Sequence, residues 1–138
     1  MTAATYMKDK ALDLFFGKQS YTVPDTLYAG LATNCTVAGV ITGEPSTSAG
    51  YARVAVTNND LATVWSGSTR GVKTNTNSAV QFPIVSSSGW GTLSTFFLAD
   101  GSTGGNVLWY STAMTPSITA TAGMAPFVNP ESLNITMT

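Results

Sequence analysis

GWGTLSTFFLADGSTGGNVLWYS, from Gly89 to Ser111, places two apolar segments on either side of a glycine-rich run. The segments Gly91–Ala99 and Asn106–Ser111 are short and rich in aromatic and β-branched residues, as β-strands are. The run DGSTGG between them starts with Asp100 and contains glycines, which adopt positive φ easily and so favour a hairpin turn. The stretch therefore predicts two core strands joined by a hairpin, with Asp100 as a turn-forming residue.

A phosphate-binding loop is the alternative interpretation of the same glycines. Such a loop needs a Lys followed by Ser or Thr, and a helix whose N-terminus faces the anion. Here no Lys follows Gly105, and Asn106–Ser111 continues in the pattern of a strand. The residues favour a turn without a bound phosphate.

Further strand patterns lie on both sides of this hairpin. Thr26–Thr33 and Tyr51–Thr57 alternate apolar and polar side chains, which indicates strands with one buried face. The other segments of this kind are Ala62–Ser66, Ser78–Phe82 and Ser132–Thr138, with Ser117–Thr121 as a further candidate. About seven strands predict a mainly β fold, an antiparallel β-sandwich or jelly-roll-like domain.

One helix precedes the β region. Apolar residues recur at i, i+4, i+7 and i+8 from Met7 to Phe15, with Thr5 as the expected N-cap and Gly17 as the expected stop. We predict a helix over residues 5–16, within a single β domain over 1–138. The helix either covers one opening of the β core or forms an arm that docks on another subunit.

The segment 34–50 is predicted to be one long irregular loop. It contains Gly39, Gly43 and Pro45 among small polar residues, and loops of this length often carry function. It also contains Cys35, the single cysteine, so no internal disulfide can form, as is usual for assembly in a reducing cytoplasm. Cys35 is interpreted as a small buried thiol, or as a contact between loops of two subunits.

Composition excludes several partners. Charged residues form only 9% of the chain, and the formal net charge is -1, so no basic surface attracts nucleic acid or an acidic membrane. The longest apolar runs are about four residues, far below the roughly 20 of a membrane-spanning helix. We therefore expect neither nucleic acid nor a membrane as a partner.

The chain has no histidine, which removes the commonest general base, the commonest zinc ligand and the usual activator of a Ser or Cys nucleophile. The acidic residues are scattered singly, and Asp60 and Asp100 lie in predicted turns. We expect no catalytic residue, no metal ligand and no cofactor, and we predict that the protein is not an enzyme.

Aromatic residues could form a sugar-stacking platform or pack in the core. Packing is favoured for all three tryptophans. Partial exposure is the alternative for Trp90, which lies between two glycines at the start of a strand. The candidate contacts to a partner are Trp90, Tyr51, Cys35, Phe15 and Phe16.

Several motifs in order resemble a family of small tailed-bacteriophage virion proteins. They are TLYAGLAT, GYARVAVT, NSAVQFP, GWGTLSTFFLAD, GGNVLWYS and SLNITMT, and they extend over nearly the whole chain. The chain departs from the pattern in TFFLAD, where a His or Gly often stands, and in the longer segment TNCTVAGVITGEPSTSAG.

The resemblance implies a structural protein of the virion, assembled in the host cytoplasm. The first hypothesis is a decoration or cement protein that binds the outer head surface. It would form a homo-oligomer, expected to be a trimer, and contact the major capsid protein or another virion protein. The alternative is a tail-fibre or baseplate-associated protein that contributes to binding of a host glycan. A third hypothesis, a depolymerase, would require a carboxylate pair in one cleft.

Overall fold

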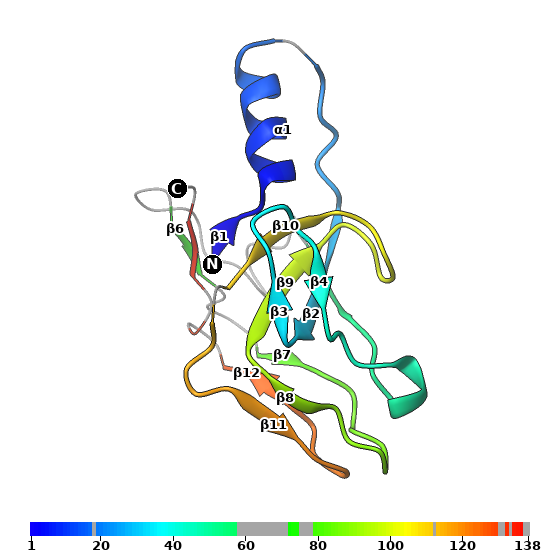
Figure 1. The fold of residues 1–138 in the computed structure, drawn as a ribbon. Helices are drawn as coiled ribbons and strands as arrows, with labels where there is room; N and C mark the ends of the chain where they lie inside the picture. The colour runs from blue at the N-terminus through cyan, green and yellow to red at the C-terminus, as the bar shows by residue number, and fades with distance from the viewer. Residues whose placement is uncertain are drawn as a thin grey trace.

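The computed structural model describes residues 1–17, 19–57, 72–74, 79–111, 113–129, 132 and 134–136. Over these residues the chain is mainly β, with one short α-helix near its N-terminus (Figure 1). The elements are β1 (Thr2–Ala3), α1 (Thr5–Phe15), β2 (Thr26–Ala32), β3 (Asn34–Cys35), β4 (Ile41–Thr42), the 3-10 helix η1 (Thr47–Ala49), β5 (Val54–Thr57), β6 (Val72–Thr74), β7 (Val80–Gln81), β8 (Gly91–Leu93), β9 (Thr95–Ala99), β10 (Val107–Tyr110), β11 (Ile118–Ala120), β12 (Phe127–Val128) and β13 (Asn134–Thr136). The predicted fold class is confirmed.

A five-stranded antiparallel sheet in the order β1-β10-β9-β2-β5 forms the centre of the fold. The hairpin predicted from the glycine-rich run is its β9–β10 pair, with Val107 opposite Ala99. Four two-stranded ribbons surround the sheet: β8–β11, β7–β12, β6–β13 and β3–β4. The two strands that flank the glycine-rich turn therefore lie inside the central sheet.

Both faces of β9 are buried. On one face Phe96 and Leu98 join a core that also contains Phe82, whose ring meets Phe96 edge to face with centroids 6.4 Å apart. On the other face Phe97 and Ala99 belong to a second apolar cluster. This burial on two sides explains why the segment FFLA, from Phe96 to Ala99, is apolar throughout instead of alternating.

The hairpin turn is held by the residue that the sequence indicated. The carboxylate of Asp100 accepts hydrogen bonds from the backbone N–H of Asn106 at 2.6 Å and from its side-chain amide at 2.9 Å. Gly105 has φ 72°, and a Cβ on it would collide with the Asp100 carboxylate. Asp100 is thus a turn former, as predicted.

The predicted strand Gly91–Ala99 is wrong as one element, because the chain changes partner at Ser94. There the Ser94 N–H donates to the carbonyl of Ala32 at 3.1 Å, and the Ser94 carbonyl accepts from the N–H of Met114 at 2.6 Å. The part before Ser94 is β8, which pairs with β11, and the part after it is β9. The candidate strand Ser117–Thr121 is confirmed as β11.

Other boundaries also differ from the prediction. The segment 34–50 is not one irregular loop, since it contains the β3–β4 hairpin, with Cys35 opposite Ile41, and the 3-10 helix η1. The predicted strand from Tyr51 begins only at Val54. Three short strands, β1, β6 and β12, have no counterpart in the prediction. The predicted strand Ala62–Ser66 lies outside the described residues.

The helix is found where the periodicity placed it, but with a different start. Its N-cap is Ala4, which gives no side-chain cap, and Thr5 is the first helical residue. The hydroxyl of Thr5 instead donates to the carbonyl of Val37 at 3.1 Å, which ties the helix to the β3–β4 hairpin. Gly17 has φ 68°, the left-handed conformation expected just beyond a helix.

Candidate functional site

The helix α1 forms an arm that projects from the body of the molecule. Figure 1 shows α1 pointing away from the central sheet, with the following chain returning alongside it to β2. None of the 11 residues of α1, all of them described, is buried. Only its first turn is anchored, where Tyr6 and Met7 pack against the core. Of the two interpretations of the amphipathic pattern, this geometry favours the arm.

The far end of the arm, which we call the tip, consists of Leu12, Leu14, Phe15 and Phe16. All four side chains are exposed, Phe15 by 81% and Phe16 by 82%. A helix of this length is marginal in water on its own, and most helical stability comes from packing of an apolar face. The tip therefore presents apolar surface that nothing in the described part of the chain covers.

The aromatic pair Tyr51 and Trp90 is buried, so the favoured interpretation of Trp90 as a packed side chain is confirmed, and the alternative of partial exposure is wrong. Trp90 is 7% exposed, and its indole N–H donates to the carbonyl of Ala49 at 2.8 Å. The ring of Tyr51 meets it edge to face, with centroids 5.2 Å apart. The Tyr51 hydroxyl accepts a hydrogen bond from the N–H of Leu31 at 2.9 Å. Both side chains hold the loop before β5 against the core and offer little surface to a partner.

Cys35 is also buried, at the start of the β3–β4 hairpin. Burial raises the pKa of its thiol above the ordinary value. Its Sγ lies 3.5 Å from the carbonyl oxygen of Thr36, the acceptor of its hydrogen bond. This environment fits the small buried thiol rather than a surface contact between loops.

A partly buried ion pair connects three loops, and sequence reasoning did not single it out. Arg53 Nε and Nη2 donate to the two carboxylate oxygens of Glu44, at 2.7 and 2.9 Å. Arg53 Nη1 donates to the carbonyls of Gly101 and Gly104 in the β9–β10 turn, at 2.8 and 2.7 Å. The signal was the motif GYAR, of which Arg53 is the last residue. The guanidinium thus fixes the turn and the segment 34–50 to β5.

Because the Tyr51 hydroxyl is buried, we expect the folded protein to lose stability at alkaline pH. Burial, the main cause, raises the pKa of Tyr51, while its hydrogen bond to the Leu31 backbone opposes the rise. Because the folded state keeps a proton that the unfolded state releases near pH 10, the free energy of unfolding falls as pH rises above about 10. The slope reaches at most about 1.4 kcal/mol per pH unit for this group.

Urea unfolding at several pH values between about pH 9 and pH 11 measures this slope. Tyr51→Phe should be less stable at neutral pH, since the Leu31 N–H loses its acceptor, but its stability should fall less steeply above pH 10. Equal slopes in the two proteins would contradict the assignment.

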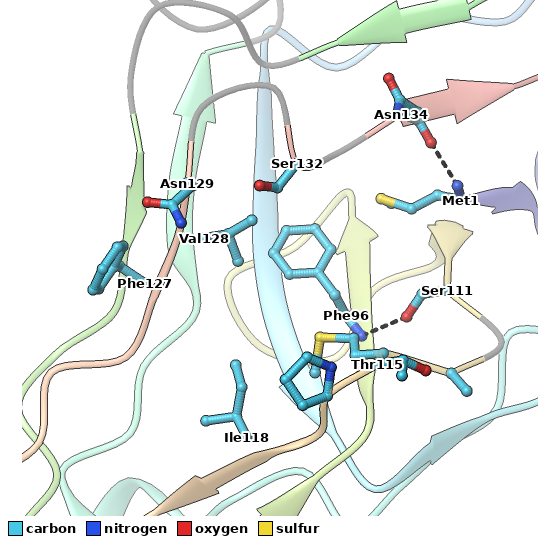
Figure 2. A pocket seen from close by; sticks show the side chains of 13 residues that line it. Met1, Phe96, Ser111, Thr115, Ile118, Phe127, Val128, Asn129, Ser132 and Asn134 are labelled. Atoms are coloured by element: carbon cyan, nitrogen blue, oxygen red, sulfur yellow. Dashed lines mark hydrogen bonds between the residues drawn. The ribbon is translucent and has the colours of Figure 1, made fainter.

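A cavity lies on the body, away from the arm. It has a volume of about 560 Å³ and is lined by residues of β9, β11, β12 and β13 and of the segments next to them, and by Met1. Figure 2 shows Phe96, Ile118 and Val128 around it, with Phe127 on one side. None of the described residues that line it is Asp, Glu, Lys or Arg. Its lining also includes the polar residues Ser111, Thr115, Asn129, Ser132 and Asn134, and the amino group of Met1 donates to the carbonyl of Asn134.

The described residues do not include a cluster of side chains that could bind a metal ion. No group of three or more His, Cys, Asp or Glu side chains there could hold a metal ion. Across the same residues, no helix combines the length and apolar character that crossing a membrane requires. Asp100 is engaged in its turn, and Asp60 lies outside the described residues. The absence of enzymatic activity remains a prediction.

The described part of the chain is a small, mainly β structure whose helical arm ends in exposed apolar side chains. The family model described as "Podophage GP4 fiber I protein gp80" matches residues 2–136. The chain belongs to this family of phage virion structural proteins, and the resemblance stated from the motifs is confirmed. A comparison with curated proteins finds no match.

Proposed function

We propose that this chain is a fibre protein of a podophage virion, and that it assembles with its neighbours through the tip of the α1 arm. The observation that carries the proposal is the exposure of Phe15 and Phe16 at the end of a projecting helix. Contiguous exposed apolar surface of this kind marks protein interaction sites. The role is structural attachment, with no reaction step.

The family description supports a fibre rather than a head decoration, because it names a fibre protein of podophage GP4. The projecting arm and the low content of charged residues suit a fibre protein and a head decoration protein equally. Binding of a host glycan has less support than the sequence suggested, because Trp90 and Tyr51, the aromatic residues considered for it, are buried. The contact made by the tip is apolar, so its strength should change little with salt.

The double substitution Phe15→Ser and Phe16→Ser tests the proposal. Burial of a Phe side chain contributes about 1.5 to 3 kcal/mol, so loss of both rings should weaken incorporation into virions roughly 100-fold or more. The fold should survive, because both side chains are exposed in the isolated chain. The measurement is the amount of protein that binds purified virions assembled without it.

Ile84→Ser is the matched control. Ile84 is 67% exposed, outside the arm, so its loss removes an apolar side chain of similar exposure without touching the tip. This variant should bind virions as the unmodified protein does. Normal incorporation of the Phe15→Ser, Phe16→Ser protein would contradict the proposed role of the arm.

A further inference from the structure

A second cavity lies where the β9–β10 turn meets the segment around η1 and the start of β5 (Figure 1). Its volume of about 350 Å³ falls within the range of ligand pockets, about 300 to 1,000 Å³. Its described lining comes from three segments of the chain, within 44–47, 51–53 and 102–104. We call it the turn cavity, and because its volume is near the lower end of the range, it suits a small ligand or one unit of a larger one.

The three segments are held together by Arg53, so the turn cavity has a fixed shape. The guanidinium donates four hydrogen bonds, two to the Glu44 carboxylate and two to the carbonyls of Gly101 and Gly104. The Arg53 side chain is only 4% exposed, so it forms part of the wall and leaves the opening to other residues. Walls that are fixed before binding spare a ligand the cost of ordering them.

The charges of the turn cavity are paired, which disfavours an ionic ligand. Among the described residues of the lining only Glu44 and Arg53 are charged, and they bind each other. Four hydrogen bonds already occupy the guanidinium, so it has little left to offer a phosphate or a carboxylate. Asp100, an acid near Arg53, has both carboxylate oxygens engaged by Asn106. The lining therefore fits a ligand without net charge.

The polar groups at the opening of the turn cavity favour a ligand with several hydroxyl groups. Thr47, Ser102 and Thr103 are exposed lining residues, and each hydroxyl both donates and accepts hydrogen bonds. The Glu44 side chain is 26% exposed, and Arg53 takes one hydrogen bond at each carboxylate oxygen, which has two acceptor sites. Glu44 is therefore a fixed acceptor for O–H groups of a ligand.

The apolar part of the lining comes from Pro45, Ala52 and Tyr51. Tyr51 is buried and forms the floor, whereas Ala52 is exposed at the rim. The Tyr51 hydroxyl is turned inward, where it accepts from the N–H of Leu31 and lies near the Glu44 carboxylate. Apolar surface beside a few placed polar groups is the usual make-up of a ligand pocket. A sugar ring matches it, because it has a C–H face and hydroxyls around its edge.

We propose that the turn cavity binds a neutral sugar unit, whose hydroxyls bond to the Glu44 carboxylate and to the three hydroxyls at the opening. No residue of α1 lines this cavity, so the inference goes beyond the proposed function and does not depend on the tip. It also requires no exposed aromatic platform. Because the ligand is uncharged, its affinity should change little with salt.

Backbone amide shifts of the isotope-labelled full chain test the proposal. The probes are the methyl glycosides of glucose, galactose, mannose, rhamnose and N-acetylglucosamine, with the methyl glycoside of glucuronic acid as the charged comparison. At least one neutral glycoside should cause saturable shifts of the amides of Ala52, Ser102 and Thr103, which line the cavity. The charged glycoside should cause none.

Two substitutions locate the bound sugar, and each has a matched control. Ala52→Trp fills the rim and should abolish the shifts, whereas Thr103→Val removes one hydroxyl and should weaken binding roughly 3- to 10-fold. Ala125→Trp and Thr22→Val make the same changes at exposed positions outside the cavity and should bind the sugar as the unmodified protein does. If Ala52→Trp fails to fold by circular dichroism, Thr103→Trp repeats the block from the turn.

A competition experiment distinguishes a free sugar from the end of a longer chain. A neutral oligosaccharide that ends in the sugar bound as a methyl glycoside should displace that glycoside if the cavity takes a chain end. If the cavity takes only the free sugar, the oligosaccharide should leave the glycoside in place. Both results depend on the neutral sugar unit that the lining fits.

Three outcomes would overturn the sugar site: no saturable binding of any neutral glycoside, binding of the charged glycoside alone, or shifts that persist in a folded variant with the cavity blocked. The Phe15→Ser, Phe16→Ser protein should bind the sugar as the unmodified protein does, because the tip lies outside the cavity. Failure of sugar binding would thus leave attachment through the tip intact, and failure of that attachment would leave the sugar site intact.

Discussion

Gly30→Ala is expected to destabilise the fold by about 3 kcal/mol, because the position has no room for a methyl group. Gly30 lies in β2, opposite Phe97 of β9. A Cβ on Gly30 would overlap the ring of Phe97, with Cε1 and Cε2 of that ring both 2.6 Å away. Phe97 is fully buried, and the guanidinium of Arg53 lies 4.9 Å from its ring centroid. The ring is thus enclosed between Gly30 and Arg53 and cannot turn aside.

The measurement is the free energy of unfolding in urea, and a second substitution identifies the cause. Phe97→Leu removes the ring atoms that the new methyl would meet, at its own cost for lost packing. The double variant should therefore lose less unfolding free energy than the sum of the losses in the two single variants. Full additivity, or a Gly30→Ala protein as stable as the unmodified one, would show that the contact is not what excludes a side chain there.

The hairpin was predictable because its cause is local. Asp100 and the glycines of DGSTGG determine a turn within seven residues of chain, from Asp100 to Asn106, and that turn was found. The break at Ser94 was not predictable, because the segment around it is uniformly suited to strands. What ends β8 and starts β9 is pairing with β11 and β2, far away in the sequence. Tertiary partners overrode a continuous local pattern.

The same distinction between local causes and tertiary partners explains which parts of the candidate site were predictable from the sequence. The helical spacing located the arm and its two phenylalanines, but the choice between arm and cover depended on where the helix packs. For Trp90 the neighbours Gly89 and Gly91 kept an open position as an alternative to packing. The partner that receives its indole N–H is the carbonyl of Ala49, distant in sequence. A buried indole finds such a partner only once the chain is folded.

Arg53 is the clearest case of a role that sequence could not assign. Its partners are Glu44, which lies in the segment predicted to be irregular, and the carbonyls of Gly101 and Gly104. A single charged residue in a strand pattern ordinarily indicates the solvent-facing side. The fold instead places the Arg53 side chain, only 4% exposed, where three segments meet.

Arg53→Ala is accordingly the second large effect, with an expected loss of about 3 kcal/mol. It would leave the Glu44 carboxylate and two carbonyl groups without their donor, and breaking a buried pair costs about 3 to 5 kcal/mol. The lower end applies, because the Glu44 side chain is 26% exposed and water can replace part of the lost interaction. The hydrogen bonds to Glu44 raise the pKa of Arg53, so the guanidinium keeps its charge.

Arg53→Lys should recover only a small part of this loss, since an ammonium group cannot donate to both carboxylate oxygens and reach the turn carbonyls as a planar guanidinium does. A double-mutant cycle with Glu44→Gln measures the coupling, which should be at least about 1 kcal/mol for partners in such contact. Additive losses in the cycle, or a Lys variant as stable as the unmodified protein, would refute the role of the bidentate pair. If the pair acts as described, Arg53→Ala should also make amide hydrogens of the Asp100–Asn106 turn exchange faster, because its carbonyls lose the group that holds them to β5.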